Sequence, residues 1–298
     1  MRIVRFMASG GYVGIGYLAG DEVVDFTRAF GMYLIAGGFS PVPATFPIED
    51  LLNEDLFEVS IFQAVREFVE QRGLRGDLRV EAPKLLAPFR PKRIIALGRN
   101  YAAHAAETGH KPPKEPVFFM KAVTSVIGPE ERVIHPEGVG RIDHEVELAV
   151  IIGGRGKRIS RAKAMNYVAG YTILNDVTAR DMQTRDMGLS HPWFLSKSFD
   201  TFGPLGPCIA LPDEIRDPHD LHLCLSVNGE VRQNSNTSYL IFKIPELIYR
   251  LSRHVTLEPG DVISTGTPEG ISPIHPGDVM EAKIESIGVL RNPVVAGR

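Results

Sequence analysis

The sequence predicts an α+β protein built around a large mixed or antiparallel β core. Apolar runs with strand character recur along most of the chain, whereas helical periodicity is confined to a few short segments. Strands and helices do not alternate in the way that produces βαβ units and a parallel sheet. In addition, Asn228-Gly229 joins two strand-like segments, and this dipeptide favours a hairpin with a type I′ turn. These three observations favour an α+β fold over one built from βαβ units.

The first part of the chain is predicted to form a small β/α unit. Strands are expected at Arg2–Phe6, Tyr12–Leu18 and Glu22–Phe26, with glycine-containing turns between them. A helix is expected over Ile61–Gln71, where apolar residues share one face, and Gly73 ends it.

A proline-punctuated stretch separates this unit from the rest of the chain. Pro83, Pro88 and Pro91 exclude a regular helix or a central strand there. The stretch is either a linker or an ordered crossing between two parts of the fold. We therefore expect a small N-terminal accessory domain over residues 1–82, followed by a larger domain that begins near residue 91.

The larger part of the chain is predicted to be rich in strands. The expected strands are Arg93–Leu97, His144–Ile152, Tyr167–Leu174, Leu221–Val227 and Glu230–Gln233. The expected helices are Ser160–Tyr167, Val177–Asp186 and Ile244–Leu251.

Composition excludes several classes of protein. The chain has 298 residues, of which 44% are hydrophobic and 23% charged, so it can bury a sizeable core. A formal net charge of −3 without blocks of like charge argues against nucleic acid or an anionic membrane as a partner. Two cysteines, Cys208 and Cys224, exclude a disulfide framework. No apolar run approaches the length of about 18 residues that a spanning helix needs, and Met1–Gly20 lacks the apolar core of an export signal. We expect a soluble, cytoplasmic protein.

Two glutamates occupy an unusual position on the strand His144–Ile152. Alternate residues of a strand share a face, so Val146, Leu148, Val150 and Ile152 form one apolar face. Glu145 and Glu147 lie on the other face, which continues as Ala149 and Ile151. Two buried carboxylates repel each other unless a cation or a proton offsets them. The alternative is an ordinary strand whose end is solvated.

Asp176 supplies a third carboxylate, directly after the apolar strand that ends at Leu174. Three carboxylates without a His or Cys cluster define an all-oxygen site, which suits Mg²⁺ or Mn²⁺, with Ca²⁺ also open, rather than zinc. Considered alone, Asn175-Asp176 is better explained as a helix cap.

His104 and Glu107 lie three residues apart, so on a helical turn they share a face. Glu107 could then orient the imidazole of His104 as a general base. The alternative is a surface His–Glu pair without a role in chemistry.

Further polar residues are candidates for a binding site. Arg180 and Gln183 share a face of the helix after Asp176, although exposed helix charges are the default explanation. Lys197 is a polar centre in apolar surroundings, which suggests an anion ligand or a side chain that reaches solvent. Thr267 lies in a turn, Thr265–Gly270, whose hydroxyls and N–H groups can cradle a carboxylate.

These motifs occur in an order that resembles the fumarylacetoacetate hydrolase family, from Pro91 to about Pro293. The segments that carry the resemblance are Asn100-Tyr101 with His104 and Glu107, Asp143-x-Glu145-x-Glu147, Asn175-Asp176, Ala179-Arg180-Asp181-x-Gln183, Lys197–Pro207, Val227-Asn228-Gly229 and Thr265–Gly270.

The resemblance implies a catalytic domain over residues 91–293 with the β-rich, mixed-sheet roll of that family, usually a homodimer. It implies Mg²⁺ or Mn²⁺ held by Glu145, Glu147 and Asp176, and a catalytic pair of His104 and Glu107 on a lid segment, with Lys197 as a further catalytic residue. Arg180, Gln183, Thr267 and Tyr101 are implied to bind substrate. The N-terminal unit resembles the variable leader domain of longer members.

Three positions depart from the pattern expected of the family. Ala122 follows Lys121 where proline is frequent, His144 replaces a common tyrosine, and Ser272 replaces a usual glycine. None of them removes an implied ligand or the catalytic pair.

The function implied by the resemblance is metal-dependent hydrolysis of a C–C bond in a 2,4-dioxo acid of the acylpyruvate type. His104 would activate water and Lys197 would stabilise the oxyanion. An isomerase of a hydroxy-dienedioate or a decarboxylase of oxaloacetate is the alternative within the same family. A non-catalytic metal-binding protein is a third possibility, against which the presence of both His104 and Glu107 argues.

Overall fold

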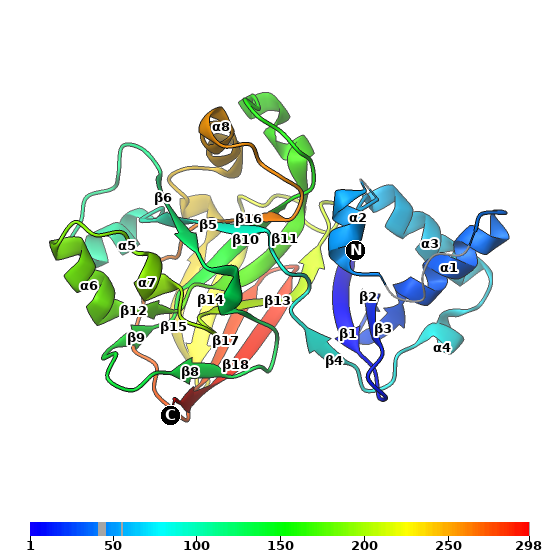
Figure 1. Ribbon diagram of the computed structural model, residues 1–298, viewed down its shortest axis with the longest axis horizontal. Coiled ribbons are helices and arrows are strands. Elements are labelled where there is room, and N and C mark those ends of the chain that lie inside the picture. Colours follow the sequence, from blue (N-terminus) through cyan, green and yellow to red (C-terminus); the bar gives the residue numbers. More distant parts are fainter. Residues whose placement is uncertain (41–45, 55, 298) are drawn as a thin grey trace.

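The computed structural model describes residues 1–40, 46–54 and 56–297. Its N-terminal part contains three strands followed by helices, and a short strand then leads into the remainder of the chain (Figure 1). The elements of this part are β1 (Arg2–Met7), β2 (Val13–Ala19), β3 (Glu22–Asp25), α1 (Phe26–Ala36), α2 (Ile48–Asn53), α3 (Val59–Gln71), α4 (Arg75–Leu78) and β4 (Lys84–Leu86).

The remainder of the chain is rich in strands, as the sequence predicts. Its strands are β5 (Arg93–Gly98), β6 (Val117–Lys121), β7 (Val126–Ile127), β8 (Val133–His135), β9 (Ile142–Asp143), β10 (Val146–Ile152), β11 (Val168–Asn175), β12 (Thr178–Ala179), β13 (Gly203–Ala210), β14 (His222–Val227), β15 (Glu230–Asn236), β16 (Asp261–Ser264), β17 (Val279–Ile284) and β18 (Gly288–Ala296). Its α-helices are α5 (Ala102–Glu107), α6 (Arg180–Gly188), α7 (Phe194–Lys197) and α8 (Ile244–His254), and 3₁₀ turns occur at Val123–Ser125, Arg161–Tyr167 and Thr237–Tyr239.

One large mixed sheet runs through both parts of the molecule. In the described chain it has 11 strands, in the order β3-β2-β1-β13-β11-β10-β16-β5-β6, with β4 paired to β1 and β7 to β13. Most neighbours are antiparallel, but β16 runs parallel to β5 and β7 runs parallel to β13. A second sheet has the order β15-β14-β17-β18-β8, and β9 and β12 form a short ladder. The predicted α+β class with a mixed sheet is confirmed.

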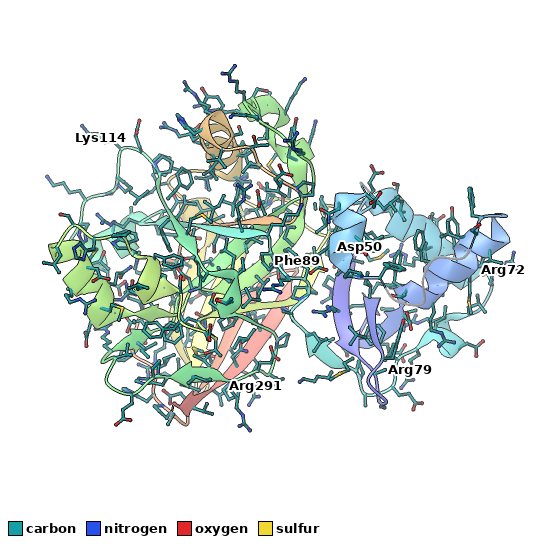
Figure 2. All side chains as sticks on the ribbon, in the orientation of Figure 1. Asp50, Arg72, Arg79, Phe89, Lys114 and Arg291 are labelled. Carbon is teal, nitrogen blue, oxygen red and sulfur yellow. The ribbon has the colours of Figure 1, made fainter. Side chains whose placement is uncertain are left out.

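The N-terminal strands join the larger sheet through β1. Arg2 pairs with Ala210 and Ile3 with Ile209 of β13, and β4 pairs with the other end of β1. The proline-punctuated stretch is therefore an ordered crossing that contains a short edge strand. Phe89 lies in this crossing and is 1% exposed, between the N-terminal elements and the larger sheet (Figure 2).

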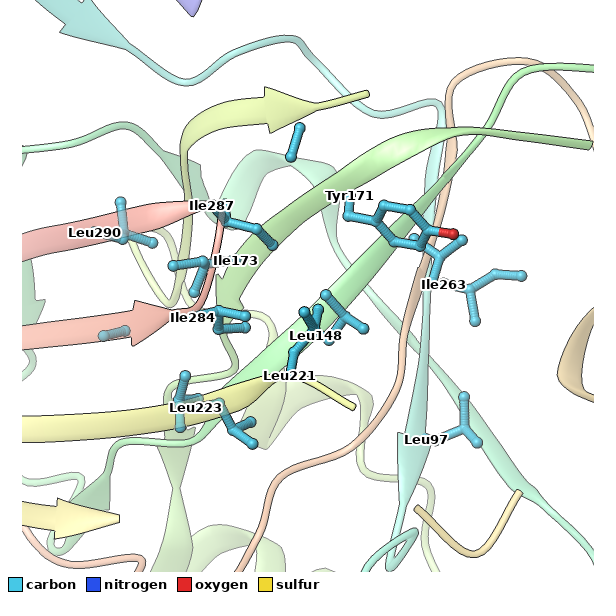
Figure 3. Close-up of a cluster of buried hydrophobic side chains, with 14 of the residues drawn as sticks. Leu97, Leu148, Tyr171, Ile173, Leu221, Leu223, Ile263, Ile284, Ile287 and Leu290 are labelled. Atoms are coloured by element: carbon cyan, nitrogen blue, oxygen red, sulfur yellow. The ribbon is translucent and has the colours of Figure 1, made fainter. Parts of the chain in front are cut away.

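Apolar side chains cover both faces of the large sheet. Val146, Leu148 and Val150 of β10 contribute to a cluster between this sheet and the second sheet, whereas Ala149 and Ile151 belong to another that includes the N-terminal helices. Figure 3 shows Leu148 and Ile173 facing Ile284 of the second sheet. Both faces of β10 are therefore buried, including the face on which the sequence places Glu147, Ala149 and Ile151.

The predicted hairpin at Asn228-Gly229 and two predicted helices can be compared with the structure. Asn228 and Gly229 have φ values of 52° and 81°, so both central residues of the β14–β15 hairpin are left-handed, as a type I′ turn requires. The helix expected over Ser160–Tyr167 is present as 3₁₀ turns over Arg161–Tyr167, which lead directly into β11. The helix predicted from Val177 begins only at Arg180, because Thr178 and Ala179 pair with β9.

In the described part of the chain, no helix combines the length and the apolar character needed to cross a membrane.

Candidate metal and substrate site

The three predicted carboxylates converge where β10 and β11 pair. Val146 pairs with Asn175, so Glu145, which precedes β10, lies beside Asp176, which follows β11, and the Asp176 N–H donates to the Glu145 carbonyl at 2.8 Å. One carboxylate oxygen from each of Glu145, Glu147 and Asp176 lies within 4.8 Å of the others. All three residues are at most 4% exposed.

Two cations pair with Glu145. Lys197, at the end of α7, places Nζ 2.7 Å from Glu145 Oε2 and 2.6 Å from Asp176 Oδ2. Arg180 donates from Nη2 to the other oxygen, Glu145 Oε1, and from Nε to Asp143 Oδ2 at 2.7 Å. Burial raises the pKa of Glu145, but the charges of Lys197 and Arg180 outweigh burial and leave that pKa well below its usual value. Glu145 is therefore ionised.

Glu147 is in a different electrostatic environment. Burial, followed by the charges of Asp176 and Glu145, raises the pKa of Glu147 well above its usual value. Its Oε2 accepts hydrogen bonds from Ser264 Oγ at 2.5 Å and from the Gly266 N–H at 2.9 Å. Thus Ser264, the last residue of β16, and Gly266, just after it, fix this carboxylate by hydrogen bonds but supply no positive charge.

Lys121 is a second buried lysine at the site, and the sequence did not predict it. It ends β6, and its Nζ donates to the Lys197 carbonyl and lies 2.9 Å from Asp176 Oδ1. Burial, followed by the charge of Lys197, lowers the pKa of Lys121. A lone lysine at a strand end has no periodic signature, and only the pairing of β6 with β5 brings it here.

These residues fit a divalent cation. Three carboxylates from neighbouring strand ends form the all-oxygen donor set that Mg²⁺, Mn²⁺ and Ca²⁺ prefer. Among the described residues, the close polar partner of the buried Asp176 Oδ1 is the ammonium of Lys121 at 2.9 Å, so this oxygen, with two lone pairs, keeps an acceptor position for a cation.

His104 and Glu107 lie together on the short helix α5, as predicted. His104 Nδ1 is 3.3 Å from Glu107 Oε2, and Glu107 Oε1 accepts the Gly270 N–H at 2.9 Å. Burial raises the pKa of Glu107, but the hydrogen bonds with His104 and Gly270 lower it overall, so Glu107 is ionised. His104 is 6% exposed, whereas Glu107 is exposed, so the imidazole is shielded from solvent while its carboxylate partner is not.

A cavity of about 460 Å³ brings these elements together. Most of the predicted site residues line it, namely His104, Glu107, Glu145, Arg180, Gln183, Lys197 and Thr267. Glu147 and Asp176 are buried behind this lining. Tyr101 is not among the described residues that line the cavity; it is 1% exposed, and its hydroxyl has no hydrogen-bond partner.

A buried hydrogen-bond network holds Thr267. Thr267 Oγ1 accepts from Gln233 Nε2 at 2.7 Å, and Gln233 Oε1 lies 3.0 Å from His144 Nδ1. His144 Nε2 in turn lies 2.9 Å from Ser272 Oγ. Two of the three departures from the expected pattern, His144 and Ser272, are therefore bonded to each other.

The arrangement has the parts needed for chemistry on a 2-oxo acid. A cation held by the carboxylates can polarise oxygens of such an acid. The His104–Glu107 pair faces the same cavity and can move a proton, and Lys197 can donate to a developing oxyanion.

Comparison with known proteins places this arrangement among related enzymes. The family described as fumarylacetoacetate (FAA) hydrolase C-terminal matches residues 93–295. A mitochondrial oxaloacetate tautomerase of Bos taurus is 42% identical over 265 residues, which cover 82% of this chain and 84% of that protein.

Two solved structures cover nearly the whole chain. Maleylpyruvate hydrolase from Sphingobium sp. SYK-6, in complex with manganese(II) ion and pyruvate, is 32% identical, with a TM-score of 0.78 and full coverage of both chains. The 2-hydroxyhepta-2,4-diene-1,7-dioate isomerase of Mycobacterium marinum is 31% identical, with a TM-score of 0.72 over 99% of this chain and 98% of that chain.

Proposed function

The chain belongs to the fumarylacetoacetate hydrolase family, and from that premise we propose that it hydrolyses a C–C bond in a 2,4-dioxo acid of the acylpyruvate type. The observation that carries the proposal is that the His104–Glu107 pair and the side chain of Lys197 line one cavity, in front of the carboxylates of Glu145, Glu147 and Asp176. The similarity to a maleylpyruvate hydrolase supports the same choice.

Glu145, Glu147 and Asp176 would hold a divalent cation, with Mg²⁺ and Mn²⁺ as the best candidates. When bound, that cation would act as a Lewis acid on the carboxylate and 2-oxo group of the substrate. Arg180 fixes Glu145 through its guanidinium and would thereby keep this ligand in place. Gln183 and Thr267 would contact the substrate from the cavity wall.

His104 would be the general base. With its Nδ1 proton donated to Glu107, its Nε2 can accept a proton from water while the water oxygen bonds to the distal carbonyl carbon. Lys197 would donate to the resulting oxyanion, since Glu145 and Asp176 engage only two of its three protons. The C3–C4 bond then breaks, its electron pair forms the enolate of pyruvate, and the imidazolium of His104 returns the proton to C3.

A second function, isomerisation or decarboxylation of a 2-oxo dicarboxylic acid, uses the same residues without water. The similarity to an oxaloacetate tautomerase and to a hydroxy-dienedioate isomerase favours this alternative. In isomerisation His104 would move a proton between two positions of the substrate. Decarboxylation would need only a held 2-oxo acid and a stabilised enolate, and neither reaction cleaves a C–C bond by hydrolysis.

Rates on acetylpyruvate and on oxaloacetate decide between the two functions. Hydrolysis predicts incorporation of ¹⁸O from labelled water into the carboxylic acid product, and a loss of about 10²–10⁴-fold in His104→Ala. Decarboxylation of oxaloacetate should fall much less in that variant, whereas Asp176→Ala should lose both reactions. Glu258→Ala, in a turn away from the site, is the matched control. Intact acetylpyruvate cleavage in His104→Ala would show that the base is another residue.

The same family premise leads us to expect a homodimer, which light scattering of the purified protein would test.

A further inference from the structure

Part of the cavity lining has no role in the proposed reaction. Arg99, which directly follows β5, is one of these residues, and Trp193 and His110 are two others. Arg99 is half-buried, and no carboxylate among the described residues forms an ion pair with it. The other two arginines of the cavity differ, because Arg141 and Arg180 both pair with Asp143 at 2.7 Å.

Aromatic side chains hold Arg99 in place. Its guanidinium carbon lies 5.5 Å from the ring centroid of Trp193, and this ring makes an edge contact with Phe119 at 5.4 Å. Gly98 permits this packing, since a Cβ there would lie 2.4 Å from a Trp193 ring atom. The backbone of Arg99 is itself left-handed, with a φ of 59°, a conformation that costs energy for a side chain of this size.

Arg99 and Lys197 each contact one ring of the Phe119–Trp193 pair. Lys197 Nζ lies 5.3 Å from the centroid of Phe119, and the guanidinium of Arg99 contacts Trp193. Both side chains line the same cavity. A ligand held at Lys197 by one end can therefore extend along this cavity wall to Arg99 with its other end.

An unpaired guanidinium in such a place calls for an anion. Burial lowers the pKa of Arg99, and no neighbouring acid offsets this effect. Guanidinium binds a carboxylate through two parallel hydrogen bonds, and stacking on an aromatic ring leaves its edge free for them. His110 supplies a second polar group in the cavity lining, since its buried Nδ1 has no hydrogen-bond partner among the residues that the structure describes.

We propose that Arg99 recognises the distal carboxylate of the substrate, so that the enzyme prefers dicarboxylic 2-oxo acids to their monocarboxylic analogues. This proposal rests on the proposed function in one respect: it assumes that the end of the ligand that binds near Glu145, Asp176 and Lys197 is a 2-oxo acid. It goes further because it assigns the substrate class and a residue that determines specificity.

Matched ligand pairs test the proposal by binding rather than turnover. The Mn²⁺-loaded protein is titrated calorimetrically with 2-oxoglutarate and with 2-oxopentanoate, which differ by one carboxylate, and with the longer pair 2-oxoadipate and 2-oxohexanoate. In the wild type the dicarboxylate of at least one pair should bind roughly 10- to 100-fold tighter. Arg99→Met should remove this preference while the affinity for the monocarboxylate stays within about twofold, and Arg99→Lys should recover part of it.

Arg141→Met is the matched control. It also removes one guanidinium from the cavity lining, but that guanidinium is already paired with Asp143, whereas Arg99 has no such partner among the described residues. Its preference should match that of the wild type. The proposal is overturned if the wild type shows no preference in either pair, or if none of the four ligands binds. It is also overturned if Arg99→Met keeps the preference, or if Arg141→Met loses it to the same extent as Arg99→Met. A protein that shows the preference but cleaves no acylpyruvate would retain the role of Arg99 and refute only the hydrolase.

Discussion

The N-terminal unit and the carboxylate site share one sheet, but different forces hold each of them together. In the N-terminal unit, Phe62 packs against Phe26 and Phe57 with ring centroids 4.5 and 5.0 Å away. At the site, Lys121 and Lys197 are just as deeply buried, yet they contact carboxylates. Apolar burial stabilises roughly in proportion to area, whereas a buried charge stabilises only while its partners are present. We therefore expect substitutions in the N-terminal unit to lower stability in proportion to the apolar area that is lost. At the site, loss of one charged residue should lower stability sharply, because its buried partner loses a counter-charge.

The largest expected effect is that of removing the N-terminal unit. A chain that begins at Glu81 loses β1–β3 and the helices, and it exposes apolar residues of the large sheet such as Ile209 and Leu211. If residues 1–82 are an accessory domain, the shortened chain still melts cooperatively and still binds Mn²⁺, at a much lower melting temperature. Circular dichroism with and without Mn²⁺ measures this. Loss of all cooperative signal would mean that both parts form a single core.

Two point variants sharpen the comparison. Phe62→Ala and Lys197→Met should each lower the free energy of unfolding by about 3–5 kcal/mol, the first by leaving a cavity and the second by removing the buried ammonium that bridges Glu145 and Asp176. Mn²⁺ should recover much more of the Lys197→Met loss, because a cation can offset the same carboxylates. Urea unfolding in chelator and in Mn²⁺ provides both values.

The control for this pair is Lys163→Met, on an exposed lysine, which should change little. An equal response of Phe62→Ala and Lys197→Met to Mn²⁺ would show that the two regions are not held by different forces.

The sequence predicted what depends on local pattern. Alternation placed the side chains of β10 correctly on two faces, and Asn228-Gly229 predicted its hairpin. The third strand was predicted to run to Phe26, but it ends at Asp25, whose carboxylate caps α1. That helix was missed, although an aspartate before an apolar run is a recognised helix start.

What the sequence could not predict depends on contacts between distant residues. The pairing of β1 with β13 joins residues about two hundred positions apart, so no local pattern fixes its register. For the same reason the positions of Lys121 and Arg99 at the site were not foreseen. The convergence of the three carboxylates was anticipated, because two strand ends and a resemblance pointed to the same place.

A smaller effect is expected from the His144–Ser272 contact. Ser272→Ala removes the partner of His144 Nε2, and His144 is fully buried, so the free energy of unfolding should fall by about 1–3 kcal/mol. Ser160→Ala, at an exposed serine that caps no helix, should change it by less than about 0.5 kcal/mol. Equal melting temperatures for the two variants would contradict a supporting role for this contact.

The smallest effect concerns a buried carboxylate of the N-terminal unit, for comparison with Glu147 at the site. Asp25 is 3% exposed and caps α1 by accepting the Arg28 N–H at 3.0 Å, and burial raises its pKa. A raised pKa means that the folded state binds this proton more tightly than the unfolded state does. Ionisation of Asp25 therefore lowers the free energy of unfolding. This loss develops as the pH rises from the unfolded pKa, about 3.9, through the higher folded pKa.

Asp25→Asn keeps the oxygen that accepts the Arg28 N–H but carries no charge at any pH. It should therefore stabilise the protein by about 0.5 kcal/mol at pH 7, and the gain should vanish below about pH 3.9, where Asp25 is protonated in both states. Thermal melts of the two proteins across this pH range test the sign, with Asp50→Asn on the exposed first turn of α2 as the control. A gain that persists in acid would come from the amide itself rather than from the lost charge. Among the described residues, Asp25 forms no ion pair with a lysine, whereas Asp176 forms two. A neutral residue can therefore replace Asp25 at little cost, and that contrast separates a carboxylate kept for a helix cap from one kept for a cation.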